Sequence, residues 1–212
     1  MADVADARVD VVFPLAGRSL PRDHRHLLAE AVHACVPWLA DEPGCGIHPV
    51  NLVHGGGEPA LLSQRARLVL RVPRQRVGDL RALAGRTLDL AGHAVRLGEP
   101  HARDLLPHNT LYAHLVVTTT LNPQGDDEAA FLAAAQSELA ELGVRSPAIC
   151  GRRQCIRSAD DAAAAPLTGF SLMLHGLAPD QARRVLDTGV GQHRRLGCGI
   201  FVAHRSAAAV GT

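Results

Sequence analysis

Four glycines and two arginines fall within the stretch GVGQHRRLGCGIFV, residues 189–202. Before it, Pro179 to Leu186 have the apolar spacing of a short helix, and at its end Gly199 to Ala203 are typical of a strand. Further back, the same criteria predict the strands Tyr112 to Thr119, Ala148 to Ile156 and Phe170 to Leu174, and the helix Asp126 to Leu142. The second half of the chain is therefore predicted to have the order β-α-β-β-α-β.

The first half of the chain repeats this order. Between the halves, Pro100 to Asn109 contain two prolines and little periodicity, which is typical of a connection. We therefore predict an α+β chain of two tandem ferredoxin-like (RRM-like, βαββαβ) domains, residues 1–104 and 105–212. The elements expected in the first half are the strand Ala7 to Leu15, the helix Asp23 to Leu39, the strands Gly44 to Val53 and Arg67 to Val72, the short helix Arg76 to Leu83, and the strand hairpin Thr87 to Leu97.

The composition excludes several classes of protein. With 47% hydrophobic and 20% charged residues, the chain is neither disordered nor built of membrane spans. The first residues lack the pattern of a secretory signal, so we expect a cytoplasmic protein with no membrane contact. A net charge of +1 excludes a polycation that binds nucleic acid indiscriminately, although all 22 basic residues are arginine. The five cysteines lack C-x-x-C spacing, so we expect buried free thiols and neither metal nor cofactor.

Three stretches resemble the CRISPR-associated repeat-processing endoribonucleases, and most closely a subgroup associated with myxobacterial type I systems. They are Leu20 to His24, Gly44 to Pro49 and the glycine block Gly189 to Val202. The block has the arrangement G-x-G-x(5)-G-x-G followed by an aliphatic residue and phenylalanine. The resemblance implies tandem ferredoxin-like domains, independently of the element order counted above.

The resemblance also implies a function. Members of this family cut the repeat of precursor CRISPR RNA without a metal, and many remain on the 3′ hairpin of the product. The expected partners are therefore CRISPR repeat RNA and other subunits of the CRISPR effector (Cascade) complex. In metal-free cleavage the 2′-hydroxyl attacks the phosphate, which leaves a 2′,3′-cyclic phosphate and a 5′-hydroxyl. Such an enzyme needs groups that move protons and groups that neutralise the phosphorane.

Histidine suits proton transfer because its pKa lies near neutrality. Family members carry their catalytic histidine in or just after the first helix. Four of the 12 histidines lie at or near this position, and any of them could be structural instead. Leu39 to Glu42, directly after the predicted helix, contain no histidine, so cleavage would use one of the four or be absent. The candidate catalytic residues are His24, His26, His33 and His48, with Tyr112 as a further group that could assist or lie in the core.

The glycine block is the first candidate for RNA binding. Glycines let backbone amides approach phosphates, and neighbouring arginines add charge. A second patch without acidic residues surrounds Arg152, and a third runs from Arg65 to Arg76; for these two, a solvated surface is the alternative. Aromatic residues are only 3%, so we expect recognition of backbone and stem shape rather than base stacking. The candidate RNA-binding residues are Gly189, Gly191, His193, Arg194, Arg195, Gly197, Gly199, Arg152, Arg153 and Arg157.

Two alternative functions remain open at this point. One is a catalytically inactive subunit of the same fold that binds CRISPR RNA. The other is a metal or small-molecule enzyme that uses histidines as ligands, for which the only supporting pattern is His24-x-His26 with Asp23 and Glu30 nearby.

Overall fold

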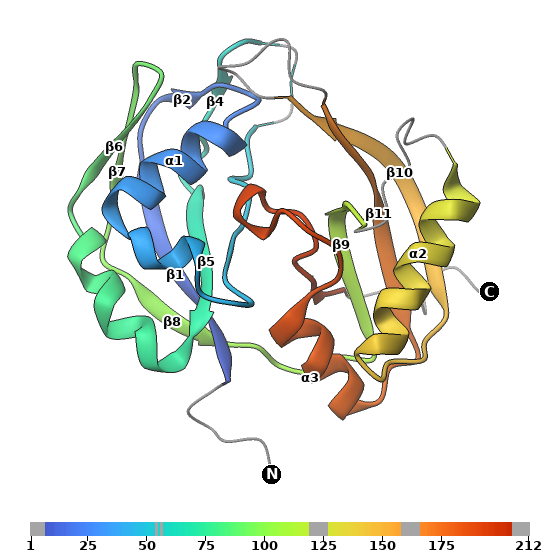
Figure 1. Ribbon diagram of the computed structural model, residues 1–212. Coiled ribbons are helices and arrows are strands. Elements are labelled where there is room, and N and C mark those ends of the chain that lie inside the picture. Colours follow the sequence, from blue (N-terminus) through green and yellow to red (C-terminus); the bar gives the residue numbers. More distant parts are fainter. Residues whose placement is uncertain (1–6, 54, 56, 119–126, 158–165, 205–212) are drawn as a thin grey trace. The chain divides into compact units, whose positions relative to one another are not determined.

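The computed structural model describes residues 7–53, 55, 57–118, 127–157 and 166–204 (Figure 1). The predicted positions of Gly56, Thr119 and Asp126 lie outside these ranges. The chain divides into two compact units. The first contains residues 1–104, 157–165 and 195–197, and the second contains the rest. Arg157 and residues 195–197, which we expected in the second domain, thus cluster with the first unit.

The first unit is a mixed α/β structure around one large sheet. The sheet has the strand order β3-β5-β1-β7-β6, and β8 also pairs with β1. A separate two-stranded sheet joins β2 and β4. The strands are β1 (Arg8–Ala16), β2 (Ser19–Leu20), β3 (Gly46–Ile47), β4 (Ala60–Leu61), β5 (Arg67–Pro73), β6 (Thr87–Leu90), β7 (His93–Leu97) and β8 (His101–Asp104); the helices are α1 (Arg25–Cys35) and the 3-10 helices Pro37–Ala40 and Arg74–Leu83.

The core of this unit lies on one face of the large sheet. Alternate residues of β1 and β5, such as Phe13 and Leu70, are fully buried together with Leu28 and Val32 of α1. The helix α1 ends at Cys35 because Pro37 has no amide hydrogen to donate and restricts the residue before it. The predicted helix over Asp23 to Leu39 is therefore two helices, the second of them a 3-10 turn.

Two predictions for the first half need correction. Of Gly44 to Val53, only Gly46–Ile47 pair as a strand. Pro49 cannot donate to a ladder, which shortens this strand. Within the predicted connection, His101–Asp104 form β8 and pair with Val9 to Val12 of β1. The connection between the halves is therefore shorter than we expected.

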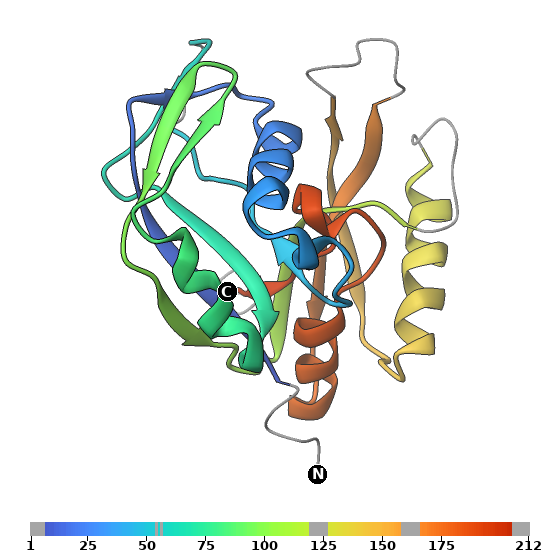
Figure 2. The ribbon, with the colours of Figure 1, turned by 60° about the vertical axis from the view of Figure 1, so that its left-hand side comes forward.

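The second unit has the element order β-α-β-β-α-β that the sequence predicts. Its single sheet has the order β10-β11-β9-β12 with antiparallel neighbours. Phe131 of α2 and Val185 of α3 belong to the same buried cluster, so both helices cover one face of the sheet (Figure 2). The elements are β9 (Thr110–Val116), α2 (Glu128–Glu141), β10 (Ala148–Ile156), β11 (Leu167–His175), α3 (Pro179–Thr188), a 3-10 turn (Arg194–Leu196) and β12 (Val202–Ala203).

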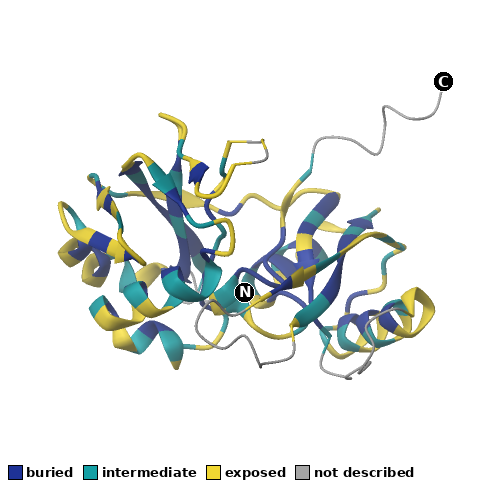
Figure 3. Cartoon of the chain, turned by 90° about the horizontal axis from the view of Figure 1, so that it is seen from above, coloured by how far each residue is buried: buried dark blue, intermediate teal, exposed yellow. Residues whose placement is uncertain are grey.

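Local chemistry explains where these helices begin and end. The side chain of Asp127 accepts hydrogen bonds from the amides of Ala129 and Ala130 and so caps α2. The helix α3 begins with Pro179 and ends at Gly189, which has a positive φ of 72°. Along the helices of both units, buried residues recur every three to four positions among exposed ones (Figure 3). No helix among the described residues is long and apolar enough to cross a membrane.

All five cysteines are free thiols, but they are not all buried as expected. Cys45 and Cys198 are buried, Cys35 and Cys150 are half-buried, and Cys155 is exposed. Burial raises the pKa of the Cys45 thiol to about 12, so this group is inert at neutral pH.

Candidate functional site

All four candidate histidines lie in the first unit, and His24 is fixed there by the backbone on both sides of its ring. Its Nδ1 lies 3.1 Å from the Arg22 carbonyl and 3.2 Å from that of Pro21. Its Nε2 accepts a hydrogen bond of 3.1 Å from the Val50 amide. This pattern fixes the neutral ring with hydrogen on Nδ1, and burial lowers the pKa of His24, which favours the same form. The geometry favours a structural role, because both nitrogens are in use.

His26 and His33 are placed differently, on the accessible side of α1. His26 is half-buried and His33 is exposed. Seven residues separate them, close to two helical turns, so they lie on the same face of the helix. Neither ring makes a hydrogen bond or an ion pair with the described part of the chain. These two histidines can therefore reach a bound ligand without disrupting the fold.

His48 lies in a cluster with an aspartate and two arginines, which the sequence did not predict. Its Nε2 lies 3.4 Å from Oδ1 of Asp10, a buried residue on β1. The same carboxylate accepts a hydrogen bond of 2.9 Å from Nε of the buried Arg71 and one of 3.0 Å from Nη2 of Arg103. Asp10 is the one acidic residue of a predicted strand and is flanked by Val9 and Val11, and this pattern is the signal that the cluster gives in the sequence.

The pKa values of this cluster follow from burial and charge. Burial raises the pKa of Asp10, but the neighbouring His48 and Arg71 lower it by more, so the net pKa lies well below the ordinary value for aspartate. Burial lowers the pKa of His48, and the nearby Asp10 offsets this only in part. Burial therefore favours the neutral form of the half-buried His48, which lies beside a carboxylate.

The arginine run from Arg65 to Arg76 is largely used within the first unit. Besides the buried Arg71, Arg74 pairs with Asp104 on β8. Arg76 pairs with Asp79 at 3.0 Å, and its guanidinium lies 3.9 Å from the centre of the Trp38 ring. These ion pairs neutralise most of the run, so it is a poorer candidate for RNA contact than its sequence suggests.

The glycine block is a tightly bonded part of the protein. In the second unit, the Gly199 amide donates to Leu115 O at 2.7 Å and the Gln192 amide to Val117 O at 2.8 Å. The Gly191 amide donates to Oε2 of Glu138 at 2.5 Å. These amides are occupied inside the protein and cannot donate to a phosphate, whereas the side chain of Arg195 in the same block is exposed.

The glycines themselves are required by the backbone. Gly189, Gly191, Gly197 and Gly199 all have positive φ, between 66° and 78°. A Cβ at Gly191 would collide with the carbonyl of Val117, and one at Gly199 with that of Val190. The spacing of glycines in this block therefore reflects close approach of backbone to backbone.

We expect Gly199→Ala to lower the free energy of unfolding by more than the roughly 1–2 kcal/mol that a positive φ costs an L-residue. The additional loss comes from the collision with the Val190 carbonyl. Gly176→Ala is the matched control, since Gly176 also has a positive φ (69°) but nothing within 4 Å of its added Cβ. Denaturant titration of both variants measures the difference, and equal losses would contradict the close approach.

The second arginine patch lies on the edge of the second unit's sheet. Arg152 and Arg153 are exposed on β10, whose register with β11 shifts between Cys150 and Arg153. Such a bulge twists an edge strand and re-aims its side chains. Arg157, exposed as well, clusters with the first unit.

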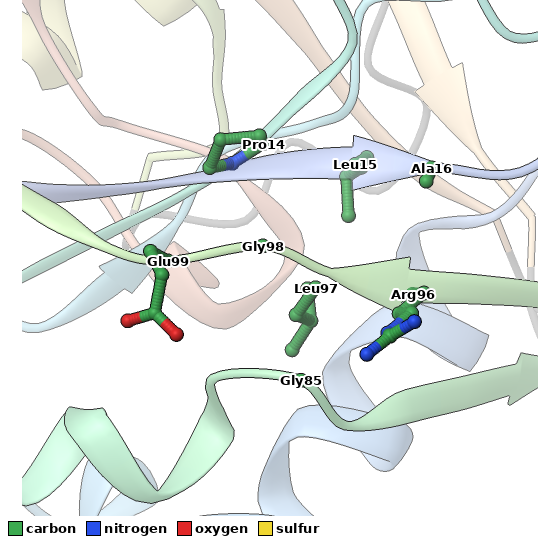
Figure 4. Close-up of a pocket in the computed structure, with 8 residues that line it drawn as sticks. All are labelled: Pro14, Leu15, Ala16, Gly85, Arg96, Leu97, Gly98 and Glu99. Atoms are coloured by element: carbon green, nitrogen blue, oxygen red, sulfur yellow. The ribbon is translucent and has the colours of Figure 1, made fainter.

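The first unit has a pocket of about 300 Å³ whose lining includes none of the candidate residues (Figure 4). The main polar side chains on its wall are those of Arg96 and Glu99, which carry opposite charges. The lining residues are Pro14, Leu15, Ala16, Gly85, Arg96, Leu97, Gly98 and Glu99.

No group of three or more His, Cys, Asp or Glu side chains that could hold a metal ion occurs in the described ranges.

Comparison with known proteins identifies the family. The family model described as Cas6 Crispr matches residues 9–206, nearly the whole chain. The chain belongs to the Cas6 family. It is 35% identical over 202 residues to the CRISPR-associated endonuclease Cas6 of Myxococcus xanthus, covering 95% of this chain and 84% of that protein.

Solved structures of Cas6 proteins share the fold at low sequence identity. One described as CRISPR associated protein Cas6 has a TM-score of 0.65 at 11% identity and covers 93% of this chain and all of that one. The product of a Cas6-related gene from Pyrococcus furiosus has a TM-score of 0.62 at 12% identity and covers 92% of this chain and 98% of that one. The resemblance inferred from the glycine block is thus confirmed at the level of the family.

Proposed function

We propose that this chain is an endoribonuclease that cuts the repeat of precursor CRISPR RNA. The proposal rests above all on membership of the Cas6 family, since the relative in Myxococcus xanthus is named as an endonuclease. In the proposed mechanism the 2′-hydroxyl of the RNA attacks the adjacent phosphate, which gives a 2′,3′-cyclic phosphate and a 5′-hydroxyl. We further propose that the protein stays bound to the 3′ hairpin of the RNA product and becomes a subunit of the surveillance complex.

Two ferredoxin-like domains would provide the scaffold. In the second unit, the order β10-β11-β9-β12 places the first and third strands of a βαββαβ repeat at the centre of the sheet. The first unit has the corresponding order β3-β5-β1, extended by the hairpin β6–β7. This correspondence supports two copies of one fold, the second more regular than the first.

The catalytic groups that we propose are His26 and His33. They are accessible and make no hydrogen bonds with the described residues, whereas the two nitrogens of His24 are bound by the backbone. Within the first unit, Arg25 at the start of α1 donates a hydrogen bond of 2.9 Å to the carbonyl of Leu196. Arg195, next to Leu196, would then supply positive charge to the phosphorane, because a guanidinium binds phosphate through its planar fork.

Cleavage assays in excess EDTA test this function directly. A synthetic repeat RNA from the host's own array is incubated with the purified chain, and the ends of the products are analysed. Ends with 2′,3′-cyclic phosphate in the presence of EDTA support the proposed reaction. Cleavage that requires added metal would contradict it.

A catalytically inactive RNA-binding subunit is the second candidate. The observation in its favour is that two of the four candidate histidines, His24 and His48, are engaged inside the protein. This candidate predicts that repeat RNA is bound and retained without any cut. The EDTA assay therefore separates the two candidates.

Removal of the edge arginines should weaken RNA binding. We expect Arg152→Gln with Arg153→Gln to lower affinity for repeat RNA and to reduce the slope of log affinity against log salt by about 1–2, because each phosphate contact releases counterions. Titration by fluorescence anisotropy at several salt concentrations measures both quantities.

The matched control removes the same amount of positive charge from two adjacent arginines elsewhere in the same unit. Arg183→Gln with Arg184→Gln changes two adjacent arginines whose partners on α3 are Asp187 and Asp180. If both double variants lose the same affinity, net charge alone explains the effect and β10 has no specific role.

A further inference from the structure

The sheet of the second unit has a row of large side chains on the face away from its helices. Ile149 on β10 pairs with Met173 on β11, Met173 pairs with Tyr112 on β9, and Tyr112 pairs with Val202 on β12. Residues directly opposite each other in paired strands point to the same side of a sheet. The four residues therefore form one row across all four strands.

This row is separate from the core beneath the helices. Leu111, Leu172 and Leu174, which alternate with the row along β9 and β11, belong to the cluster that α2 and α3 cover, whereas no member of the row does. At the ends of the row, Ile149 is 52% exposed and Val202 is 37% exposed. In the middle, Tyr112 and Met173 are half-buried. The row is therefore an accessible surface and not a second core.

The centre of the row offers an aromatic ring. The ring of His204 lies beside that of Tyr112, with centroids 5.5 Å apart and planes tilted by 52°. Tyr112 is the chain's only tyrosine, and the low aromatic content had argued against base stacking. Composition does not reveal position, however, and this single ring stands on a central strand of an open sheet face. A thioether and aliphatic side chains flank it, and such groups also pack against the face of a nucleobase.

The charge of the sheet suits an anionic ligand. The four strands β9, β10, β11 and β12 contain no aspartate or glutamate. The residues of these strands that carry or can acquire positive charge are His114 of β9, His175 of β11, and Arg152 and Arg153 of β10. An apolar segment of a protein partner would pack against the row, but the absence of acidic residues from the strands would not favour its binding. A nucleotide with a stacked base and a phosphate uses both features.

We infer that this face binds an unpaired nucleotide of the RNA, with its base stacked on Tyr112. The inference rests on the proposed function, in that it takes RNA as the substrate. It adds that the protein recognises a single-stranded segment in addition to a stem. Stacking of this kind is tolerant of sequence, because every base has a π face.

Photo-crosslinking of the full chain to fluorescein-labelled octauridine tests the inference without any substitution. After irradiation and digestion, mass spectrometry should find the nucleotide attached to Tyr112 or to a neighbouring residue of this face. Crosslinks confined to other parts of the chain would overturn the inference. Crosslinking to a bound protein segment in cell extract, with none to octauridine, would also overturn it and indicate a protein partner.

Two substitutions at one position then measure the contribution of the ring. We expect Tyr112→Leu to bind octauridine about tenfold more weakly, which is within the range for loss of one stacked base. Tyr112→Phe keeps the ring and should stay within about twofold of the parent chain. A blunt-ended RNA duplex without unpaired nucleotides should bind all three proteins equally. Equal octauridine binding by the two variants would overturn the inference, and thermal melting verifies that both are folded.

These outcomes are distinguishable from failure of the proposed function. If repeat RNA is cut in EDTA but octauridine does not crosslink to this face, only the stacking site is wrong. If octauridine crosslinks to Tyr112 but repeat RNA is not cut, the nucleotide site stands and the chain is a binding subunit.

Discussion

Replacement of both His26 and His33 by alanine is expected to lower the cleavage rate of repeat RNA by at least about 100-fold, the lower end of what a positioned acid or base contributes. Affinity for the RNA should change by no more than about threefold, since the arginines remain. Alanine is the strongest helix former, so α1 should be preserved. Single-turnover cleavage and anisotropy titration measure the two quantities separately.

The matched control for this variant removes two histidines elsewhere. His101 and His108 are exposed and belong to other segments of the chain, β8 and the connection after it, so His101→Ala with His108→Ala should cleave at the parental rate. Full activity in the variant of His26 and His33 would return the catalytic role to His24 or His48. The single substitutions then show whether one histidine or both take part.

Asp10→Asn is expected to lower the free energy of unfolding of the first unit by about 3–5 kcal/mol. The substitution removes the buried carboxylate that pairs with the buried Arg71, and loss of one partner of a buried ion pair has effects of this size. Denaturant unfolding followed by the fluorescence of Trp38 measures the change. This residue is the only tryptophan and packs against the core of the same unit, so its signal reports on that unit alone.

Asp104→Asn provides the matched control. Asp104 also accepts a hydrogen bond from an arginine, Arg74, but both side chains are largely exposed. An exposed ion pair contributes only about 0–1 kcal/mol, so this variant should be nearly as stable as the parent. An equal decrease in the free energy of unfolding of the two variants would show that burial does not increase the contribution of Asp10.

The pH dependence gives a second test of the same cluster. Because the pKa of Asp10 is lowered in the folded state, its contribution is fully present above the pKa of an unfolded aspartate, about 3.9, and is lost as the pH falls below it. The difference in stability between the parent chain and Asp10→Asn should therefore shrink by about 1.4 kcal/mol for each pH unit below 4. A difference that is constant between pH 7 and pH 3 would contradict the lowered pKa.

Elements whose pattern matches their packing could be predicted closely from the sequence. The predicted strand Ala148 to Ile156 is confirmed residue for residue, and the helix expected over Pro179 to Leu186 extends by two residues to Thr188. The errors fall where pairing partners decide the outcome. Gly44 to Val53 has strand-like composition but a short paired stretch, and His101–Asp104 pair as β8 although their sequence is polar. Strand propensity depends mainly on which neighbours a segment packs against.

For the candidate site, the sequence supplied the residue types but not their surroundings. His24 and His26 are two positions apart, yet one is bonded by the backbone on both ring nitrogens and the other is accessible on α1. Helical geometry separates them, because residues two apart point to different sides of a helix. The partners of Asp10 are 38 to 93 residues away in the chain, so no local pattern could predict the cluster.

The glycine block shows what each level of structure determined. The sequence by itself determined the family, through four glycines at fixed spacing before an aliphatic residue and Phe201. Glycine is needed at such positions because the backbone there closely approaches other backbone atoms. Only the tertiary structure decided that the amides of Gly191, Gln192 and Gly199 are used inside the protein. Their acceptors lie on α2 and β9 or just beyond, distant segments that only the folded chain brings close.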